Sequence, residues 1–435
     1  MIEKIVIANR GEIAVRIIRS CREMGIRSVA LFSEADRMSK HVMLADEAYP
    51  IGPAPSKESY LDVDKIIETA LKCGADAVHP GYGFLSENAG FARKCEVAGI
   101  TFIGPRAETI ERMGDKISAR RSMTEAGVPV VPGIQRQLES ATEAERICRE
   151  IGLPVILKAA SGGGGKGMRL IRSESEIGEA YAAAKSEALS SFGDETVYIE
   201  KYIEEPHHIE FQILGDAHGN IVHLYDRECS VQRRHQKIIE ESPSPLMTAE
   251  LRERMGRDAV AAARSVGYLG AGTVEFLVDR ERNYYFLEMN TRLQVEHPIT
   301  EEVCGVDLVK EQIFVADGRP LRLTQRDIVQ RGHAIECRIC AEDASAGFMP
   351  SPGVISQLTE PGGIGVRLDS YIYEKYEIPV HYDPMIGKLI VWATTREFAV
   401  ERMRRALDEY KITGVKTNIA YLGSILELPE LVGGD

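Results

Sequence analysis

Residues 288–297 read Glu288-Met289-Asn290-Thr291-Arg292-Leu293-Gln294-Val295-Glu296-His297. Alternate side chains of an extended chain project to the same face. If the whole stretch is extended, five polar side chains form one row: Glu288, Asn290, Arg292, Gln294 and Glu296. An amphipathic strand with a solvated face would give the same alternation. The apolar segments upstream, and Pro298, which ends a strand, favour a functional row of metal ligand, anion-binding group and base.

The segment before this stretch predicts a β-hairpin, with strands at 272–278 and 283–290. If Asp279 pairs with Tyr284, Glu275 lies opposite Glu288. Two like charges directly opposed in a sheet are destabilising. A bridging divalent cation reverses the sign of that interaction, and carboxylate and amide oxygens suit magnesium or manganese bound with nucleotide phosphates. Other registers would separate the two carboxylates and remove this argument.

A glycine-rich run, Ser161-Gly162-Gly163-Gly164-Gly165-Lys166-Gly167-Met168, lies between predicted strands at 154–159 and 169–171. Consecutive glycines let backbone amides approach phosphates closely, and Lys158 and Lys166 add positive charge. The run is not a Walker A loop, because Gly167 follows the lysine and a strand follows the loop. A flexible hairpin tip is the alternative. The composition favours a mobile loop that closes over a nucleotide.

Two other sets of cationic residues each allow two interpretations. Lys116 begins a predicted helix, where the helix dipole disfavours a cation; an anionic ligand or simple solvation would each relieve that conflict. The segment after the predicted strand 221–225 holds a basic cluster of Arg233, Arg234, His235 and Lys237. This cluster predicts either an anion site or a solvated basic loop.

The N-terminal part predicts β-α-β order, with strands at 4–8 and 28–32 around a helix. The first turn has only Gly11 of the dinucleotide fingerprint, so we interpret it as scaffold. The loop 81–87 follows a strand end, where a ligand loop and a plain turn are both possible. The last third predicts mainly strands, with one at 333–339, a loop leading into a strand over 382–392, and then an amphipathic helix at 396–410. Its expected inward-facing residues are Phe398, Val400, Met403, Leu407 and Tyr410.

Length and composition predict a globular protein of about three domains, with 435 residues, 44% hydrophobic and 27% charged. A net charge of −13 argues against general affinity for nucleic acid or an anionic membrane. The chain shows no signal-peptide pattern and no apolar run of about 18 residues. Eight scattered cysteines, with one C-x-x-C at Cys337 and Cys340, predict reduced thiols rather than a zinc site. We therefore expect a cytoplasmic protein.

Five segments occur together in this chain: Ile7-Ala8-Asn9-Arg10-Gly11-Glu12-Ile13-Ala14, His79-Pro80-Gly81-Tyr82-Gly83-Phe84-Leu85-Ser86-Glu87-Asn88, the glycine run at 161–168, residues 288–297, and Glu336-Cys337-Arg338-Ile339. The combination resembles the biotin carboxylase family of the ATP-grasp superfamily, from the first residues to about Asn418. The resemblance implies a multidomain α/β and α+β fold. Its parts are a Rossmann-like parallel-sheet domain at 1–113, an ATP-grasp domain at 114–330 with a small mobile lid at 130–204, and a β-rich domain at 331–435.

The resemblance also implies an activity, ATP-dependent carboxylation of biotin by bicarbonate through carboxyphosphate. It further implies that this activity is the first half-reaction of acetyl-CoA carboxylase, in malonyl-CoA and fatty acid synthesis. A pyruvate, propionyl-CoA or other acyl-CoA carboxylase is the alternative. No Met-Lys-Met biotin-attachment sequence occurs, so we expect biotin to arrive on a separate biotin carboxyl carrier protein or on a detached part of a longer chain. Carboxyltransferase subunits and a homodimer are also implied.

The resemblance carries roles to individual residues of this chain. Those matching ATP contacts are Lys116, Lys158, His208, Gln232 and His235. Those matching the phosphate-covering loop are Gly164, Gly165, Lys166 and Gly167, and those matching the adenine pocket are Glu200, Lys201 and Ile203. Those matching ligands of Mg²⁺ or Mn²⁺ are Glu275, Glu288 and Asn290. Those matching the bicarbonate site are Lys237, Arg292, Gln294 and Val295, with Glu296 as the base and Arg338 holding biotin.

Two other functions use part of the same residue set. Another ATP-grasp ligase, which activates a carboxylate as an acyl phosphate for an amine, would share the lysines, the glycine loop and the metal carboxylates. It does not call for Arg292, Glu296 and Arg338 together. A nucleotide-sensing regulatory protein would have a degenerate site, whereas every residue named above is intact here.

Overall fold

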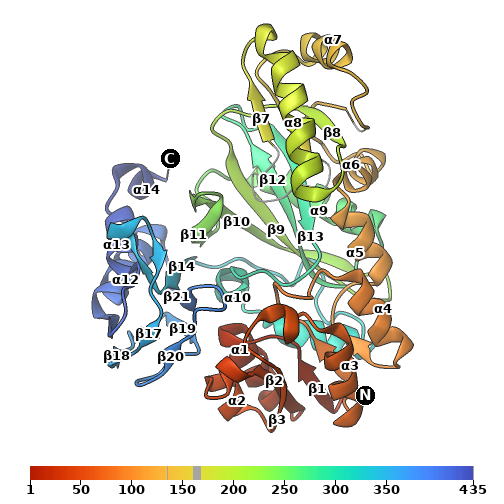
Figure 1. Ribbon diagram of the computed structural model, residues 1–435. Coiled ribbons are helices and arrows are strands. Elements are labelled where there is room, and N and C mark those ends of the chain that lie inside the picture. The colour runs from red at the N-terminus through yellow and green to blue at the C-terminus, as the bar shows by residue number, and fades with distance from the viewer. Residues whose placement is uncertain (135, 160–167, 435) are drawn as a thin grey trace.

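A computed structural model of the protein describes residues 1–134, 136–159 and 168–434 (Figure 1). The N-terminal part, red to orange in Figure 1, is a parallel sheet of order β3-β2-β1-β4-β5 flanked by helices. Its strands are β1 Lys4–Ile7, β2 Arg27–Ser33, β3 Glu47–Gly52, β4 Ala77–His79 and β5 Thr101–Phe102. Its helices are α1 Gly11–Glu23, α2 Lys40–Leu44, α3 Val63–Lys72, α4 Ala89–Val97 and α5 Ala107–Gly114. The predicted β-α-β start and parallel sheet are confirmed.

A small unit stands at the top of Figure 1, where the antiparallel sheet β7-β6-β8 packs against two helices. Its elements are α7 Ala141–Ile151, β6 Val155–Ala159, β7 Met168–Ile171, α8 Ile177–Phe192 and β8 Val197–Lys201. It is preceded by α6 Lys116–Glu125, whose N-terminus is capped by the Asp115 carboxylate accepting from the Ser118 N–H. Lys116 is therefore the first residue of a helix, as its sequence context predicted.

The centre is an eight-stranded sheet of order β13-β12-β9-β10-β11-β14-β21-β19. Its first five strands and the helices near them are β9 His207–Gly215, β10 Ile221–Arg233, β11 Gln236–Ser242, α9 Ala249–Ser265, β12 Gly270–Val278, β13 Tyr284–Asn290, α10 His297–Cys304 and α11 Leu308–Ala316. α9 packs on β10, β9 and β12. The sheet continues without a break into the C-terminal part, because β11 pairs with β14.

The C-terminal part, blue in Figure 1, adds short strands and three helices to the far end of that sheet. Its strands are β14 His333–Cys340, β15 Glu342–Asp343, β16 Met349–Pro350, β17 Gly353–Val354, β18 Gln357–Thr359, β19 Val366–Ser370, β20 Glu377–Ile378, β21 Met385–Ala393 and β22 Lys411–Thr413. Its helices are α12 Arg396–Glu409, α13 Ile419–Ile425 and α14 Pro429–Gly433. The predicted β-rich character is confirmed. Phe398 was wrongly expected to face inward; its side chain is 62% exposed.

Three local expectations need correction. The row at 288–297 is not extended throughout: β13 ends at Asn290, residues 291–296 form a loop, and α10 begins at His297. The hairpin register starts one residue away from the predicted one, with Val278 opposite Tyr284, and a β-bulge at Leu287 then restores Glu275 opposite Glu288. The predicted strand 221–225 extends to Arg233, so Arg233 ends a strand rather than lying in a loop.

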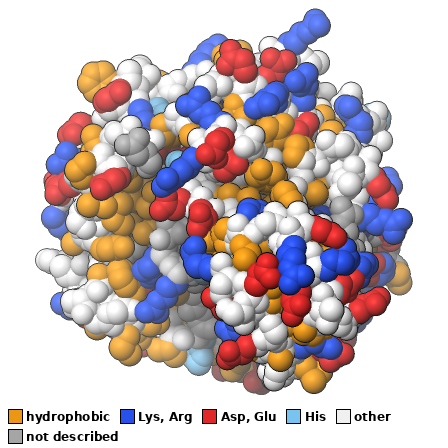
Figure 2. Space-filling model, turned by 90° about the horizontal axis from the view of Figure 1, so that it is seen from above, with side chains coloured by type: hydrophobic (Ala, Val, Ile, Leu, Met, Phe, Trp, Pro, Cys, Tyr) orange, Lys and Arg blue, Asp and Glu red, His pale blue; other side chains and the backbone are white. Residues whose placement is uncertain are grey.

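Charged side chains of both signs lie on the surface of the molecule (Figure 2). Figure 2 shows acidic and basic side chains interspersed over the face seen from above, without a large field of one sign. Among the described residues, no helix has the length and hydropathy needed to cross a bilayer.

Candidate active site

A cleft of about 1410 Å³ lies where the four parts of the chain meet. Its walls come from the N-terminal loop 82–84, the strands of the small unit, the central hairpins and the C-terminal strands. Every predicted site residue within the described segments lines it: Lys116, Lys158, Glu200, Lys201, Ile203, His208, Gln232, His235, Lys237, Glu275, Glu288, Asn290, Arg292, Gln294, Val295, Glu296 and Arg338. The predicted phosphate loop, Gly164 to Gly167 with Lys166, lies outside the described residues.

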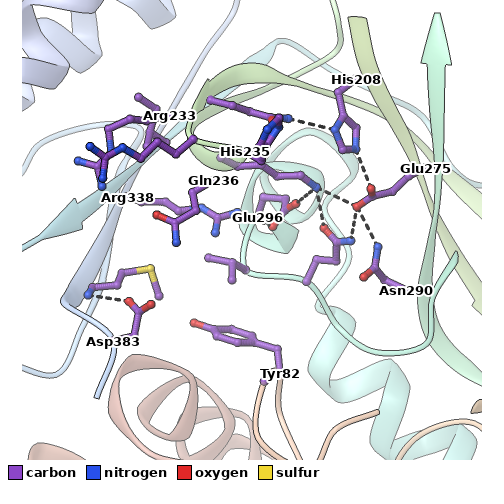
Figure 3. A pocket seen from close by; sticks show the side chains of 18 of the residues that line it. Tyr82, His208, Arg233, His235, Gln236, Glu275, Asn290, Glu296, Arg338 and Asp383 are labelled. Atoms are coloured by element: carbon purple, nitrogen blue, oxygen red, sulfur yellow. Dashed lines mark hydrogen bonds and ion pairs between the residues drawn. The ribbon is translucent and has the colours of Figure 1, made fainter. Parts of the chain in front are cut away.

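The Glu296 carboxylate lies between two cations from different strands. Its Oε1 accepts from Lys237 Nζ at 2.7 Å, and its Oε2 accepts from Arg338 Nη2 at 3.0 Å. Figure 3 shows Arg338 extending toward Glu296, while Tyr82 faces the same cavity from the N-terminal part. Burial opposes ionisation, but the charges of Lys237 and Arg338 hold the pKa of Glu296 well below its usual range. Glu296 is therefore ionised at neutral pH.

Lys237 is the centre of a cluster of buried charges. Its ammonium donates to Glu210 at 2.6 Å, Glu275 at 3.0 Å and Glu296 at 2.7 Å. It also donates to the Gln294 amide oxygen at 3.3 Å. Burial alone would lower the pKa of Lys237, but the three carboxylates raise it well above its ordinary value. The ammonium is thus a permanent cation among acceptors, which is the geometry expected of an anion-binding group.

The turn that carries Lys237 into the cleft has an uncommon backbone. Arg234 and His235 join β10 to β11 with φ values of 50° and 65°. A two-residue hairpin turn with both residues at positive φ usually contains glycine or asparagine. Non-glycine residues in that region carry local strain, which is frequent at functional sites. The turn keeps Arg233 and Lys237 on neighbouring strands, and Arg233 is ion-paired with Glu342 at 2.8 Å.

The predicted metal ligands come together at the β12–β13 hairpin. Glu275 and Glu288 are cross-strand partners. The Asn290 amide donates to Glu275 Oε1 at 2.8 Å, and His208 Nε2 lies 2.8 Å from Glu275 Oε2. Desolvation by the cleft walls, followed by the neighbouring charge of Glu275, raises the pKa of Glu288, although its side chain is exposed within the cleft. Two opposed carboxylates with an adjacent amide oxygen form a donor set that fits a hard divalent cation.

Arg292 and Gln294 occupy the loop after β13. Arg292 Nε donates to Glu87 Oε2 at 2.9 Å, and its Nη2 donates to Asn290 Oδ1 at 3.0 Å. The Gln294 amide donates to Glu275 Oε1 at 2.9 Å. The loop thus directs alternating polar side chains into the cleft although it is not a strand. The predicted convergence of these residues is found, by a different backbone path.

The cations expected to bind phosphate lie on the side of the cleft nearest the small unit. Lys158 Nζ pairs with Glu200 Oε2 at 2.7 Å, and Arg120 pairs with the other oxygen of Glu200. Burial, together with the charges of Lys116 and Arg120, lowers the pKa of Lys158 to about 8. Lys201 directs its ammonium to the Gly152 and Leu153 carbonyls at 3.0 and 2.9 Å. The Lys201 side chain therefore supports the cleft wall rather than a ligand.

Several charged residues of the site were not identified from the sequence. Glu210 is buried between Arg227 at 2.5 Å and Lys237, and Glu240 accepts from Arg338 Nε at 2.6 Å. Glu87 was noted only as part of a loop, and Arg120 was not noted. The alternation of 207–214 places Glu210 on the same face as His208, a signal that was available. The partners of Arg338 and Arg292 depend on tertiary contacts that no local pattern encodes.

The comparisons with known proteins cover the whole chain. Residues 1–110 match the family described as "Biotin carboxylase, N-terminal domain". Residues 115–324 match "Carbamoyl-phosphate synthase L chain, ATP binding domain", and residues 336–435 match "Biotin carboxylase C-terminal domain". A solved biotin carboxylase from Campylobacter jejuni, in a complex with a β,γ-ATP compound, has a TM-score of 0.96 and 49% identity; the match covers 100% of this chain and 97% of that one.

Two curated proteins show the same relationship in sequence. A pyruvate carboxylase subunit of Methanothermobacter thermautotrophicus is 59% identical over 98% of this chain and 87% of that protein. "Biotin carboxylase 1" of Bacillus subtilis is 55% identical over 100% of this chain and 97% of that protein. A solved biotin carboxylase domain dimer of Hydrogenobacter thermophilus 2-oxoglutarate carboxylase, with MgADP and bicarbonate, has a TM-score of 0.94 and 51% identity over 100% of this chain and 96% of that one. The chain belongs to the biotin carboxylase family.

Proposed function

We propose that this protein uses ATP and bicarbonate to carboxylate biotin carried on a biotin carboxyl carrier protein. The observation that carries this proposal is the ionised Glu296 held between Lys237 and Arg338. An acyl-phosphate-forming ligase would need the phosphate-binding lysines and the metal carboxylates, but not this arrangement. Membership of the biotin carboxylase family supports the same substrate set.

In the proposed reaction, Glu296 accepts the bicarbonate proton and a bicarbonate oxygen attacks the γ-phosphorus of ATP, which gives carboxyphosphate and ADP. Carboxyphosphate breaks down to CO2 and phosphate, and that phosphate accepts the proton of the biotin ureido nitrogen. Arg338 stabilises the negative charge that develops on the ureido oxygen. The ureido nitrogen then attacks CO2 and becomes carboxylated.

Bicarbonate itself adjusts the proton affinity of the base. An incoming anion at Lys237 and Arg292 adds negative charge beside Glu296 and competes for the same ammonium. Both effects raise the pKa of Glu296 from its low value toward one suited to proton transfer. The base therefore accepts a proton chiefly when the substrate is bound.

Glu275, Glu288 and Asn290 would hold Mg²⁺ or Mn²⁺ at the β12–β13 hairpin. The cation would supply neutralisation of phosphate charge. Lys116 and Lys158 would bind phosphate oxygens, and His208 would fix the Glu275 carboxylate, which it approaches to 2.8 Å. In the proposed division, 1–113, 114–330 with the lid 130–204, and 331–435 are the three domains. The three matched segments support this division.

We further propose that the carboxylated carrier serves acetyl-CoA carboxylase, with a homodimer as the working form and carboxyltransferase subunits as partners. The bacterial and chloroplast relatives named biotin carboxylase support this context. The pyruvate carboxylase relative of Methanothermobacter thermautotrophicus supports pyruvate as a second candidate acceptor. Purification of the complex from its source cells, followed by transfer of labelled bicarbonate to acetyl-CoA, propionyl-CoA or pyruvate, distinguishes the acceptors.

The reaction is tested by phosphate release from MgATP with and without bicarbonate and free biotin. Native protein should show release that requires bicarbonate and is stimulated by biotin. Arg338→Ala should lose the biotin stimulation. Arg396→Ala is its matched control, because Arg396 also pairs with a β11 carboxylate, Glu241 at 2.7 Å, but lies on α12 and not among the described cleft residues. Turnover indifferent to bicarbonate and biotin would favour another ATP-grasp ligase.

A further inference from the structure

A buried lysine in the C-terminal sheet contacts the loop that carries the proposed base. Lys388 lies on β21 and its side chain is 0% exposed. It is the cross-strand partner of Arg338 on one side and of Asp369 on the other. Directly opposed residues of neighbouring strands project to the same face of a sheet. Arg338 and Lys388 therefore reach toward the central part of the protein side by side.

These two cations hold consecutive residues of one loop. Arg338 donates to the Glu296 carboxylate at 3.0 Å, and Lys388 Nζ donates to the Val295 carbonyl at 2.8 Å. The preceding carbonyl, that of Gln294, lies 2.7 Å from His297 Nδ1. Because a trans peptide is planar, fixing the Val295 carbonyl also fixes the direction of the Glu296 N–H. The loop 294–296 is thus held at three successive residues.

The Lys388 ammonium also contacts the N-terminal part. Lys388 Nζ lies 3.3 Å from Glu12 Oε1, near the start of α1, and 5.8 Å from the centre of the Tyr82 ring. The Tyr82 hydroxyl donates to the same Glu12 oxygen. Tyr82 and Glu12 both line the cleft. One side chain therefore joins the C-terminal sheet, the base loop and the N-terminal wall of the cleft.

A buried lysine at this position is energetically unfavourable compared with a hydrophobic residue. Burial of an ammonium is strongly unfavourable unless its partners replace the water that it loses. Lys388 Nζ has the Val295 carbonyl and the Glu12 carboxylate within reach. The Asp369 and Glu336 carboxylates also interact with its charge. A hydrophobic residue would serve packing alone equally well. The hydrogen bond to the Val295 carbonyl and the ion pair with Glu12 are the two contacts that a hydrophobic residue would not supply.

We propose that Lys388 is a positioning residue that, together with Glu12, holds the 294–296 loop in the geometry needed for bicarbonate binding and proton transfer. This inference rests on the proposed function, since the loop acts on bicarbonate only in that reaction. Lys388 itself is not among the described residues that line the cleft.

The test compares Lys388→Met with Lys4→Met. Lys4 is the matched control: it is also buried, donates to the Cys73 carbonyl at 2.8 Å and pairs with Glu47 at 2.6 Å, but lies in the N-terminal sheet. Lys388→Met should lower kcat/KM for bicarbonate about tenfold or more, as expected for loss of a charge-assisted hydrogen bond, while KM for MgATP stays within about twofold. Lys4→Met should lower thermal stability without a selective loss of kcat/KM for bicarbonate. Lys388→Arg, which restores a donor, should recover part of the loss.

Hydrogen exchange supplies a readout that does not depend on turnover. Backbone amides of residues 291–297 should exchange faster in Lys388→Met than in native protein or Lys4→Met. Unchanged exchange in this segment, or an unchanged kcat/KM for bicarbonate, overturns the positioning role. If Lys388→Met does not fold, hydrogen exchange and kcat/KM for bicarbonate are measured on Glu12→Gln instead. If either quantity is unchanged in that variant, the positioning role is overturned. Native protein without bicarbonate-dependent turnover would refute the proposed function, while the exchange result would still decide the role of Lys388.

Discussion

Removal of the Lys237 ammonium should damage both stability and turnover in a way that depends on pH. Lys237→Met keeps the unbranched stem and removes the charge. Three carboxylates then remain around the lost group: Glu210, Glu275 and Glu296, at 2.6, 3.0 and 2.7 Å from the native ammonium. Breaking a buried ion pair by removing one partner costs about 3–5 kcal/mol. Because the chain has several parts, the effect is better followed as a fall in Tm, of about 5 °C or more at pH 8.

The pH dependence has a definite sign. In native protein the pKa values of Glu275 and Glu296 lie below their ordinary values. Their contribution to stability is present above the unfolded-state pKa and is lost as pH falls through the folded-state pKa. Without Lys237, burial and mutual repulsion raise the pKa of a remaining carboxyl above its unfolded value. That group then destabilises the fold increasingly as pH rises through its new folded-state pKa.

The Tm difference between native protein and Lys237→Met should therefore widen from about pH 5 to about pH 8. Calorimetry at several pH values measures it, with Lys4→Met as the control. Glu47, the partner of Lys4, has a lowered pKa, and the first cause is its hydrogen bond to Lys4. In Lys4→Met the pKa of Glu47 should return to its ordinary value, at which the carboxylate is still ionised throughout this pH range. Phosphate release should lose its bicarbonate dependence in Lys237→Met. A Tm difference that is constant between about pH 5 and 8 would refute the reasoning, because the carboxylates would then not depend on the ammonium.

Three further changes have separate expected outcomes. Glu288→Gln should raise the Mg²⁺ concentration for half-maximal phosphate release about tenfold; an unchanged titration would remove Glu288 from the metal site. Glu240→Gln weakens the anchoring of Arg338 and should raise KM for free biotin about tenfold without changing KM for MgATP; equal changes in both would contradict this role. Because the pKa of Lys158 is about 8, nucleotide affinity should fall as pH rises past that value, and Lys158→Arg should remove this dependence in equilibrium binding.

The convergence of site residues could be predicted where local periodicity fixes direction. Glu275 and Glu288 are opposed because they lie on two strands of one hairpin, and the short connection brings the strands back into contact. The predicted register was one residue off at the tip, yet the carboxylates still meet, because the bulge at Leu287 compensates. Lys116 and Lys158 were located by their positions at a helix start and on a strand. Such features depend on neighbours in sequence.

Other features depend on neighbours in space. The ion pair of Arg292 with Glu87 joins residues 205 positions apart, and that of Arg338 with Glu240 joins two strands that meet only when the C-terminal part docks. The sequence of the loop 291–296 alternates like that of a strand, but β13 ends at Asn290 and the loop pairs with no neighbouring strand. Tertiary contacts, including those of Lys388 and His297, hold that loop instead. No periodicity in the sequence encodes such contacts.

The cations of the cleft are paired with its carboxylates, and this affects how an acidic protein binds anionic substrates. With a net charge of −13, the chain does not attract bicarbonate or ATP by its overall field. Lys237, Arg338 and Arg292 each contact at least one carboxylate, which keeps the cations oriented in place of solvent. An anion that enters must share these partners, and the sharing returns proton affinity to Glu296. In the proposed mechanism, binding of the substrate and activation of the base then follow from one exchange of ion-pair partners.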